Sequence, residues 1–167
     1  MTSYAAFLRG VSPMNANMAD LVRAFTKAGF TDVATVAASG NVVFRAKGTL
    51  AQVEKRAAAA SQFKPFIRTI DELDALLARD PFAAFKLPRN AKRVITFLRA
   101  RPKPRPALPA SLEKATIYAI SGREAFTAYQ VQPGNPVFMT LLARTLGDDI
   151  TTRTWDSVAR IVAKAPR

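Results

Sequence analysis

The sequence of 167 residues contains no histidine and no cysteine. Without cysteine there is no disulfide, no thiolate nucleophile and no cysteine-ligated zinc site. Without histidine there is no Ser-His-Asp or Cys-His catalytic system, and the usual proton shuttle near neutral pH is missing. Any acid–base chemistry would have to use a carboxylate, a lysine or a tyrosine whose pKa is shifted.

Acidic residues are also scarce, since 12 Asp and Glu stand against 25 Lys and Arg and give a net charge of +13. A field of this sign attracts polyanions and anionic small molecules. The alternative is that the charge only keeps the protein in solution, because a composition rich in Arg and Ala is also typical of a GC-rich genome.

Long apolar runs are absent too, and none approaches the roughly 20 residues of a membrane span. The short apolar start ends at Arg9 and does not fit a secretory signal, so we expect a cytoplasmic protein. We expect no cofactor. We expect no metal either, because Asp71, Glu72 and Asp74 suit the first turns of a helix, and the adjacent Asp148 and Asp149 lack the further oxygen ligands that a cation needs.

The first half alternates apolar segments in the order strand, helix, strand, strand, helix, strand. Helix starts are marked by Asn17 and by a capping box at Thr49 and Gln52. Pro65 places the last of these strands at a sheet edge. The order is that of a split βαβ, or ferredoxin-like, unit. The expected elements span residues 4–8, 18–28, 33–37, 42–45, 49–60 and 63–69.

The second half begins after a helix that opens with a capping box at Thr69 and Glu72 and ends at Asp80-Pro81. We predict strands over residues 94–98, 115–120 and 124–131, a proline-rich surface connection over 101–109, and two final helices, the first starting at Asn135-Pro136. This pattern predicts an α+β fold of two ferredoxin-like (split βαβ) subdomains, residues 1–80 and 81–167. Their sheets are mainly antiparallel, with extra C-terminal helices.

Six short stretches together resemble one bacterial family, the "domain of unknown function 1697" family, across nearly the whole chain. They are Phe-Leu-Arg-Gly-Val at 7–11, Met-Ala-Asp-Leu at 18–21, Gly-Phe-Thr-Asp-Val at 29–33, Ser-Gly-Asn-Val-Val-Phe at 39–44, Asp-Pro-Phe at 80–82 and Thr-Thr-Arg-Thr-Trp-Asp at 151–156. The resemblance implies a two-subdomain α+β fold with ferredoxin-like units, and it implies no established activity.

The chain departs from the family pattern at two places. Residues 14–17 replace a Gly-Gly pair that usually stands in the first loop, and Pro136-Val137-Phe138 replaces a Ser-Lys pair. Glycines bring backbone N–H groups close to an anion and lysine meets a phosphate, so this member lacks two anion contacts that the pattern implies for its relatives.

Polar residues in three loops are candidates for binding a ligand. The first loop leads from a strand into a helix N-terminus, a favoured place for an anion, although its Asn side chains have a second role as caps. The Ser-Gly-Asn turn and the Thr-Thr-Arg-Thr-Trp-Asp run each carry donors, with structural roles as the alternative. The candidates are Arg9, Asn15, Asn17, Ser39, Asn41, Arg153 and Asp156.

Residues 86–105 carry eight cations and no acid. Cations in this number neutralise several phosphates of a nucleic acid, while a solvated basic face is the alternative reading, because a strand alternates its faces. The members of this basic surface are Lys86, Arg89, Lys92, Arg93, Arg99, Arg101, Lys103 and Arg105.

Three functions remain open from the sequence. The first is a non-catalytic or accessory module that binds an anionic partner, nucleic acid among the options, through its basic surface. The second is an enzyme that acts on a small anionic metabolite in a cleft between the subdomains, by carboxylate chemistry. The third is an oligomeric scaffold that uses an exposed sheet edge.

Overall fold

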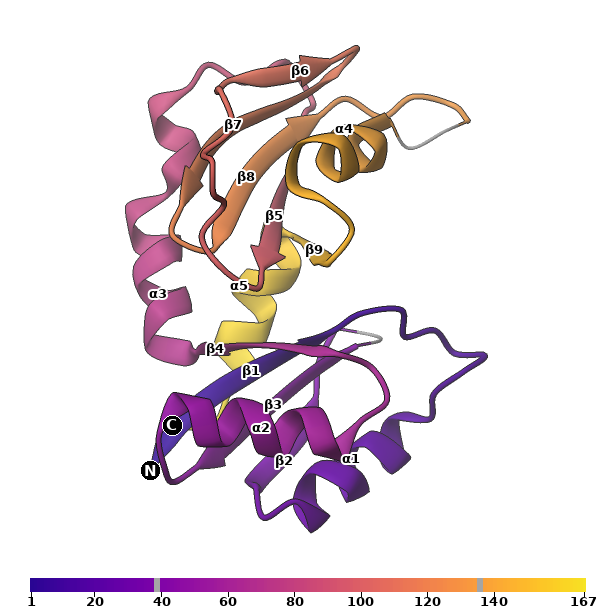
Figure 1. Ribbon diagram of the computed structural model, residues 1–167, viewed down its shortest axis with the longest axis vertical. Helices are drawn as coiled ribbons and strands as arrows, with labels where there is room; N and C mark the ends of the chain where they lie inside the picture. Colours follow the sequence, from indigo (N-terminus) through magenta and orange to yellow (C-terminus); the bar gives the residue numbers. More distant parts are fainter. Residues whose placement is uncertain (38–39, 135–136) are drawn as a thin grey trace. The chain divides into compact units, whose positions relative to one another are not determined.

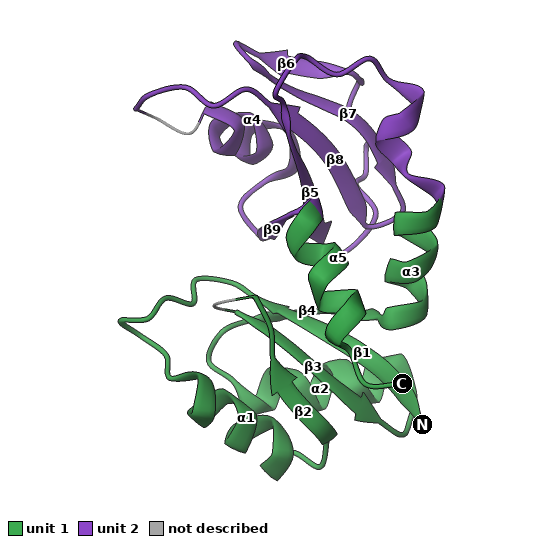
Figure 2. Ribbon diagram, turned by 180° about the vertical axis from the view of Figure 1, so that it is seen from behind, with its two compact units in different colours: residues 1–78, 156–167 green, residues 79–155 purple. Residues whose placement is uncertain are grey.

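The computed structural model describes residues 1–37, 40–134 and 137–167, and the chain divides into two compact units (Figure 2). Unit 1 comprises residues 1–78 and 156–167, and unit 2 comprises residues 79–155. The sequence-based division had placed residues 156–167 in the second half. In the structure the chain end is tied to unit 1: the Ser3 hydroxyl donates to the carbonyl of Pro166, and Arg167 Nη1 lies 2.7 Å from Asp74 Oδ2.

Unit 1 has the predicted order of elements (Figure 1). The elements are β1 (Thr2–Leu8), α1 (Met18–Lys27), β2 (Thr31–Thr35), β3 (Asn41–Ala46), α2 (Leu50–Ala60) and β4 (Pro65–Thr69). Its sheet has the order β2-β3-β1-β4 with antiparallel neighbours, which confirms the split βαβ fold. The edge position of β4 suits its first residue, Pro65, which has no N–H to donate to a ladder.

The core of unit 1 is formed by alternate residues of the strands and by the apolar faces of the two helices. Residues of even number in β1, among them Tyr4 and Leu8, share one cluster with side chains of both helices, so α1 and α2 cover the same face of the sheet. The rings of Phe30 and Phe44 lie 4.3 Å apart between centroids. Phe7, which points to the opposite face, is also buried, so β1 is enclosed on both sides.

The helices start where side chains can satisfy their first N–H groups. Asn17 Oδ1 accepts from the N–H of Ala19 at 2.8 Å, and Thr49 forms a reciprocal capping box with Gln52. A second box starts α3 (Ile70–Arg79), because Thr69 and Glu72 each accept from the other's backbone N–H, at 3.1 and 2.8 Å. These caps confirm the predicted helix starts.

Unit 2 is built on a five-stranded sheet in the order β6-β7-β8-β5-β9, in which all neighbours are antiparallel. Its elements are η1 (Pro81–Ala84), β5 (Lys92–Leu98), β6 (Ala110–Leu112), β7 (Ala115–Ser121), β8 (Glu124–Tyr129), α4 (Val137–Leu146) and β9 (Ile150–Thr154). Strands β6 and β9 were not predicted. The predicted helix start at Asn135-Pro136 lies outside the described residues. The last helix, α5, spans Trp155–Lys164.

Both faces of this sheet carry packed side chains. On one face Leu141 and Leu142 of α4 join Leu98 and Ile117 in a cluster. Elsewhere in the unit the Phe82 ring meets the Phe126 and Trp155 rings edge to face, with centroids 5.8 and 5.7 Å apart. We therefore expect unit 2 to bind polar ligands at the turns and ends of its strands rather than on a face of the sheet.

Candidate anion-binding site

Strand β5 divides the predicted basic surface into two groups. It takes up Lys92–Leu98, and a strand of this length separates its ends by about 20 Å at ~3.3 Å per residue. Before or at its start lie Lys86, Arg89 and Lys92, and after its end lie Arg99, Arg101, Lys103 and Arg105. The acid-free run thus supplies two separate basic groups rather than one continuous patch.

A pocket of about 370 Å³ lies beside the second group, at the turn between β7 and β8. It contains two arginines, an exposed serine and a glycine, and no acid. We call it the β7–β8 pocket; its lining residues are Arg101, Pro102, Arg105, Ile120, Ser121 and Gly122.

The pocket forms because β6 is too short to cover the whole edge of β7. Its 3 residues pair only with Ala115, Thr116 and Ile117, and a register irregularity follows in β7. The prolines of residues 101–109 exclude helix and central strand, so the connection runs as an extended segment. Arg105 Nη2 donates to the carbonyl of Ile120 at 3.1 Å, which satisfies an edge group that β6 does not reach.

A third arginine reaches this turn from a distant part of the chain. Arg79, the last residue of α3, donates from Nη2 to the Ser121 hydroxyl at 3.2 Å. Beside Gly122 the space is open, since a Cβ built there would meet no atom within 4 Å. Three guanidinium groups from two segments of unit 2, the end of α3 and the proline-rich connection, therefore gather at one turn.

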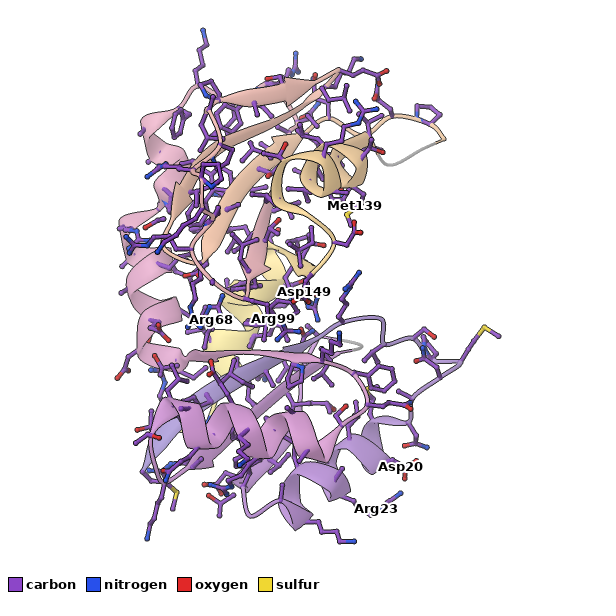
Figure 3. All side chains as sticks on the ribbon, viewed as in Figure 1. Asp20, Arg23, Arg68, Arg99, Met139 and Asp149 are labelled. Carbon is purple, nitrogen blue, oxygen red and sulfur yellow. The ribbon has the colours of Figure 1, made fainter. Side chains whose placement is uncertain are left out.

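Two members of the basic surface pair with acidic side chains of unit 2. Arg99 Nε lies 3.1 Å from Asp149 Oδ2 (Figure 3). Arg93 lies 3.7 Å from Asp80 and 4.8 Å from the Trp155 ring centroid. Within the described ranges, no acidic partner is found for the other six: Lys86, Arg89, Lys92, Arg101, Lys103 and Arg105.

The predicted candidates of the first loop lie together in unit 1, but their side chains hold the loop itself. Asn15 donates to the carbonyl of Gly10 and accepts from the N–H of Ser12, both at 2.8 Å, and Asn17 caps α1. Arg9 is exposed at the end of β1. A neighbouring pocket of about 260 Å³ includes the carboxylate residue Asp20, which pairs with Arg23 (Figure 3) and disfavours an anion.

The β2–β3 turn lies next to that loop, because the N–H of Leu8 donates to the carbonyl of Gly40 at 2.7 Å. Asn41 is only 2% exposed and donates from Nδ2 to the carbonyls of Val36 and Ala37, at 3.1 and 3.2 Å. Ser39 lies outside the described residues. The amide of Asn41 is therefore engaged by the backbone that follows β2.

Arg153 lies in β9 and is largely buried, and this burial lowers its pKa to about 10. Its Nη1 donates to the Thr151 hydroxyl at 2.8 Å and to the Thr152 carbonyl at 2.7 Å. Asp156 is exposed in the first turn of α5, where the helix dipole favours a negative charge. Arg153 thus secures its own strand, and Asp156 suits a helix start.

Sequence reasoning found Arg101 and Arg105 but missed the groups that complete their pocket. Ser121 and Gly122 lie between two predicted strands and Arg79 lies just before the predicted helix end at Asp80-Pro81, so none of the three was a candidate for binding. The acid-free composition around residues 86–105 was the available signal, and the contact with Arg79 spans 42 positions of sequence.

The described residues contain neither a cluster of metal ligands nor a membrane-spanning helix. No group of three or more acidic side chains in residues 1–37, 40–134 and 137–167 is placed to hold a metal ion. Over the same part of the chain, no helix has the length and apolar character needed to cross a bilayer.

Two antiparallel sheets with helices, in two units, together with an arginine-lined turn, define a basic α+β protein of the split βαβ class. The chain belongs to the family described as "Protein of unknown function (DUF1697)", whose model matches residues 1–126.

A solved structure shares this fold: the conserved bacterial protein SP0830 from Streptococcus pneumoniae, with 18% sequence identity and a TM-score of 0.73. The alignment covers 98% of this chain and 97% of that one. No curated protein matches the chain. The family description assigns no activity, so function has to be argued from the site.

Proposed function

We propose that this protein is a binding module for an anionic partner, and that the partner is nucleic acid bound through the basic groups of unit 2. The observation that carries the proposal is the gathering of Arg79, Arg101 and Arg105 around the β7–β8 turn without an acid in the pocket lining. Guanidinium groups suit phosphate oxygens, because they present several N–H donors in a fixed plane.

The enzyme hypothesis has less support. Its candidates Asn15, Asn17 and Asn41 donate to or accept from backbone groups of their own loops. The chain also has no histidine and no cysteine to act as base or nucleophile. A binding function needs only positive charge and accessible donors, and unit 2 offers both.

Fluorescence anisotropy with labelled single-stranded DNA, single-stranded RNA and duplex DNA tests the proposal. We expect micromolar binding near ~50 mM salt, with affinity falling linearly on a log–log plot as salt rises to about 300 mM. An absence of binding at the lowest salt would overturn the proposal.

A triple variant, Arg101→Gln with Lys103→Gln and Arg105→Gln, locates the contact. Loss of three phosphate contacts should lower the salt slope for single strands by about 2 and weaken binding at low salt by at least tenfold. The control is Arg144→Gln, an exposed arginine of α4 that does not line the pocket. Equal effects of the two variants would contradict a contact at the β7–β8 turn.

A further inference from the structure

We propose that the β7–β8 pocket recognises a phosphomonoester group, either at the end of a nucleic acid strand or on a small organic phosphate. The inference rests on the proposed function and narrows it, because it replaces a general affinity for phosphates with recognition of one terminal group. Three lines of argument favour it: preorganised donors, charge matching and the room in the pocket.

Two of the three guanidinium groups are already held in place. Arg79 is held by the Ser121 hydroxyl at 3.2 Å, and Arg105 by the carbonyl of Ile120 at 3.1 Å. Each bond uses one of the five N–H donors of an arginine, and the remaining donors are then oriented at little further entropic cost. The Ser121 hydroxyl accepts from Arg79 and so keeps its own proton to donate.

The charge of the site matches a dianion better than a monoanion. Arg79, Arg101 and Arg105 bring three positive charges to the turn, and no acid lines the pocket. A phosphomonoester carries close to two negative charges at pH 7 and has three terminal oxygens that accept hydrogen bonds. An internal phosphodiester carries one charge and two such oxygens, and a carboxylate likewise, so each leaves donors of the site unmatched.

The pocket also has space for more than the phosphate itself. Its volume of about 370 Å³ falls at the lower end of the ~300–1,000 Å³ typical of small-molecule sites. Pro102 and Ile120 give it apolar wall next to the arginines, and the space beside Gly122 is open. The sugar or other carbon group that bears the phosphate can therefore lie against these residues.

Isothermal titration calorimetry on the full chain distinguishes the sources of the phosphate. The probes are ribose 5-phosphate, ribose, a 5′-phosphorylated oligonucleotide, and a 5′-hydroxyl oligonucleotide two nucleotides longer, which balances the charge of the terminal dianion. We expect ribose 5-phosphate to bind and ribose not to bind, and the 5′-phosphorylated strand to bind at least fivefold more tightly than the longer 5′-hydroxyl strand.

Arg101→Gln is the sharpest variant, because the side chain of Arg101 has no hydrogen-bond or ion-pair partner within the described residues and its loss leaves the fold contacts intact. It should abolish the preference for the 5′-phosphate, while the matched control Arg144→Gln should retain it. Circular dichroism checks that both variants are folded. A preference that persists in Arg101→Gln would overturn the pocket as its source.

The pH profile gives an independent readout. The second pKa of a phosphomonoester is ~6, so a site selective for the dianion should bind ribose 5-phosphate about fourfold more tightly at pH 7 than at pH 5.5. The groups that face the ligand are arginines and a serine, and the chain has no histidine, so no imidazole of the protein contributes to this change. A flat profile would contradict recognition of the dianion.

Failure of this inference and failure of the proposed function look different. Equal binding of both strands, with no binding of ribose 5-phosphate, would overturn the inference and leave general nucleic acid binding in place. Binding of ribose 5-phosphate alone, with neither strand bound, would support the pocket and overturn nucleic acid as the partner. No binding of any probe would overturn both.

Discussion

At the residue scale, Arg56 shows how one guanidinium ties three segments of unit 1 together. From α2 it donates through Nε and Nη2 to the carbonyl of Ala28, at 3.2 and 3.1 Å, and through Nη1 to that of Lys47 at 3.3 Å. It also lies 4.5 Å from the centroid of the Phe30 ring. Arg56 thereby satisfies a carbonyl at the end of α1, which has no partner within the helix.

Gly29 follows this carbonyl in the chain, and the guanidinium of Arg56 leaves no room for a side chain there. It has a φ of +91°, and a Cβ there would lie 2.9 Å from Arg56 Nη2. Gly147 follows α4 with a similar φ of +85°, and a Cβ there would meet nothing within 4 Å. Both positions are strained by a side chain, but only at Gly29 would the guanidinium also have to leave its acceptor.

We therefore predict that Gly29→Ala lowers the free energy of unfolding by about 1 kcal/mol more than Gly147→Ala, because it also displaces hydrogen bonds to a charged group. Urea denaturation measures both. In an Arg56→Ala background the excess should vanish, since the bonds are already gone. An excess that survives in the double variant would show that Arg56 is not its cause.

Arg153 predicts a pH dependence of stability. Burial lowers its pKa from the ordinary value of an arginine to about 10. Between these values the folded protein has lost a proton that the unfolded chain still binds, so stability rises with pH. The charged form thus destabilises the fold below pH 10, and this effect declines as the pH rises through the window.

Above pH 10, we expect the free energy of unfolding of the wild-type protein to rise relative to that of Arg153→Met. The difference in free energy of unfolding should be flat between about pH 7 and 9 and then rise by up to ~1.4 kcal/mol per pH unit. Denaturant titrations at stepped pH measure it, and Arg144→Met, at an exposed site, should show no such rise. A difference that falls above pH 10 would contradict the assignment.

At the element scale, the two capping boxes predict where helix stability is concentrated. We expect Thr49→Ala and Thr69→Ala each to lower the free energy of unfolding by about 1 kcal/mol, because each leaves a helix N–H without its acceptor. Thr26→Ala is the control: its hydroxyl bonds to the Val22 carbonyl inside α1 and caps nothing. A loss at Thr26 equal to that at Thr69 would argue against a capping effect.

Elements whose signals are local were predicted from the sequence, and elements that depend on a distant partner were not. Caps and periodicity fixed α1, α2 and α3, and Pro65 indicated the edge position of β4. β9 was missed, because Ile-Thr-Thr-Arg-Thr has no apolar alternation and becomes a strand by pairing with β5. β6 was missed because it has only 3 residues.

The candidate site was predictable only in part, because its charge can be read from the sequence and its assembly cannot. The acid-free stretch identified Arg101 and Arg105 from composition alone, since excess charge is visible without coordinates. Their separation from Lys86 and Arg89 depends on the length of β5, and the arrival of Arg79 at Ser121 depends on tertiary structure. The sequence also could not show that Asn15 and Asn41 donate to backbone carbonyls of their own loops, because these bonds depend on the path of the backbone.

At the scale of the whole molecule, unit 1 is assembled from two stretches of chain. Residues 156–167 belong to it together with residues 1–78, and they bury Val158, Ile161 and Val162. Burial of apolar side chains of this size contributes ~1.5–3 kcal/mol each. Most of the stability that this segment supplies therefore comes from its apolar side chains.

We predict that a chain ending at Trp155 loses the cooperative thermal unfolding transition of unit 1, because total stability is of the same order as the burial removed. A chain lacking only residues 166 and 167 should keep the transition and lose about 1 kcal/mol or less, since it gives up only the contacts with Ser3 and Asp74. Calorimetry measures both. An unchanged transition in the chain that ends at Trp155 would contradict the assignment of residues 156–167 to unit 1.

The same split has a consequence for biosynthesis. Residues 79–155 are made and emerge before residues 156–167, so unit 2 is complete in the emerging chain while unit 1, which began first, still lacks its second stretch. Nascent chains arrested at successive lengths should then gain protease resistance in the reverse of the order in which the two units start.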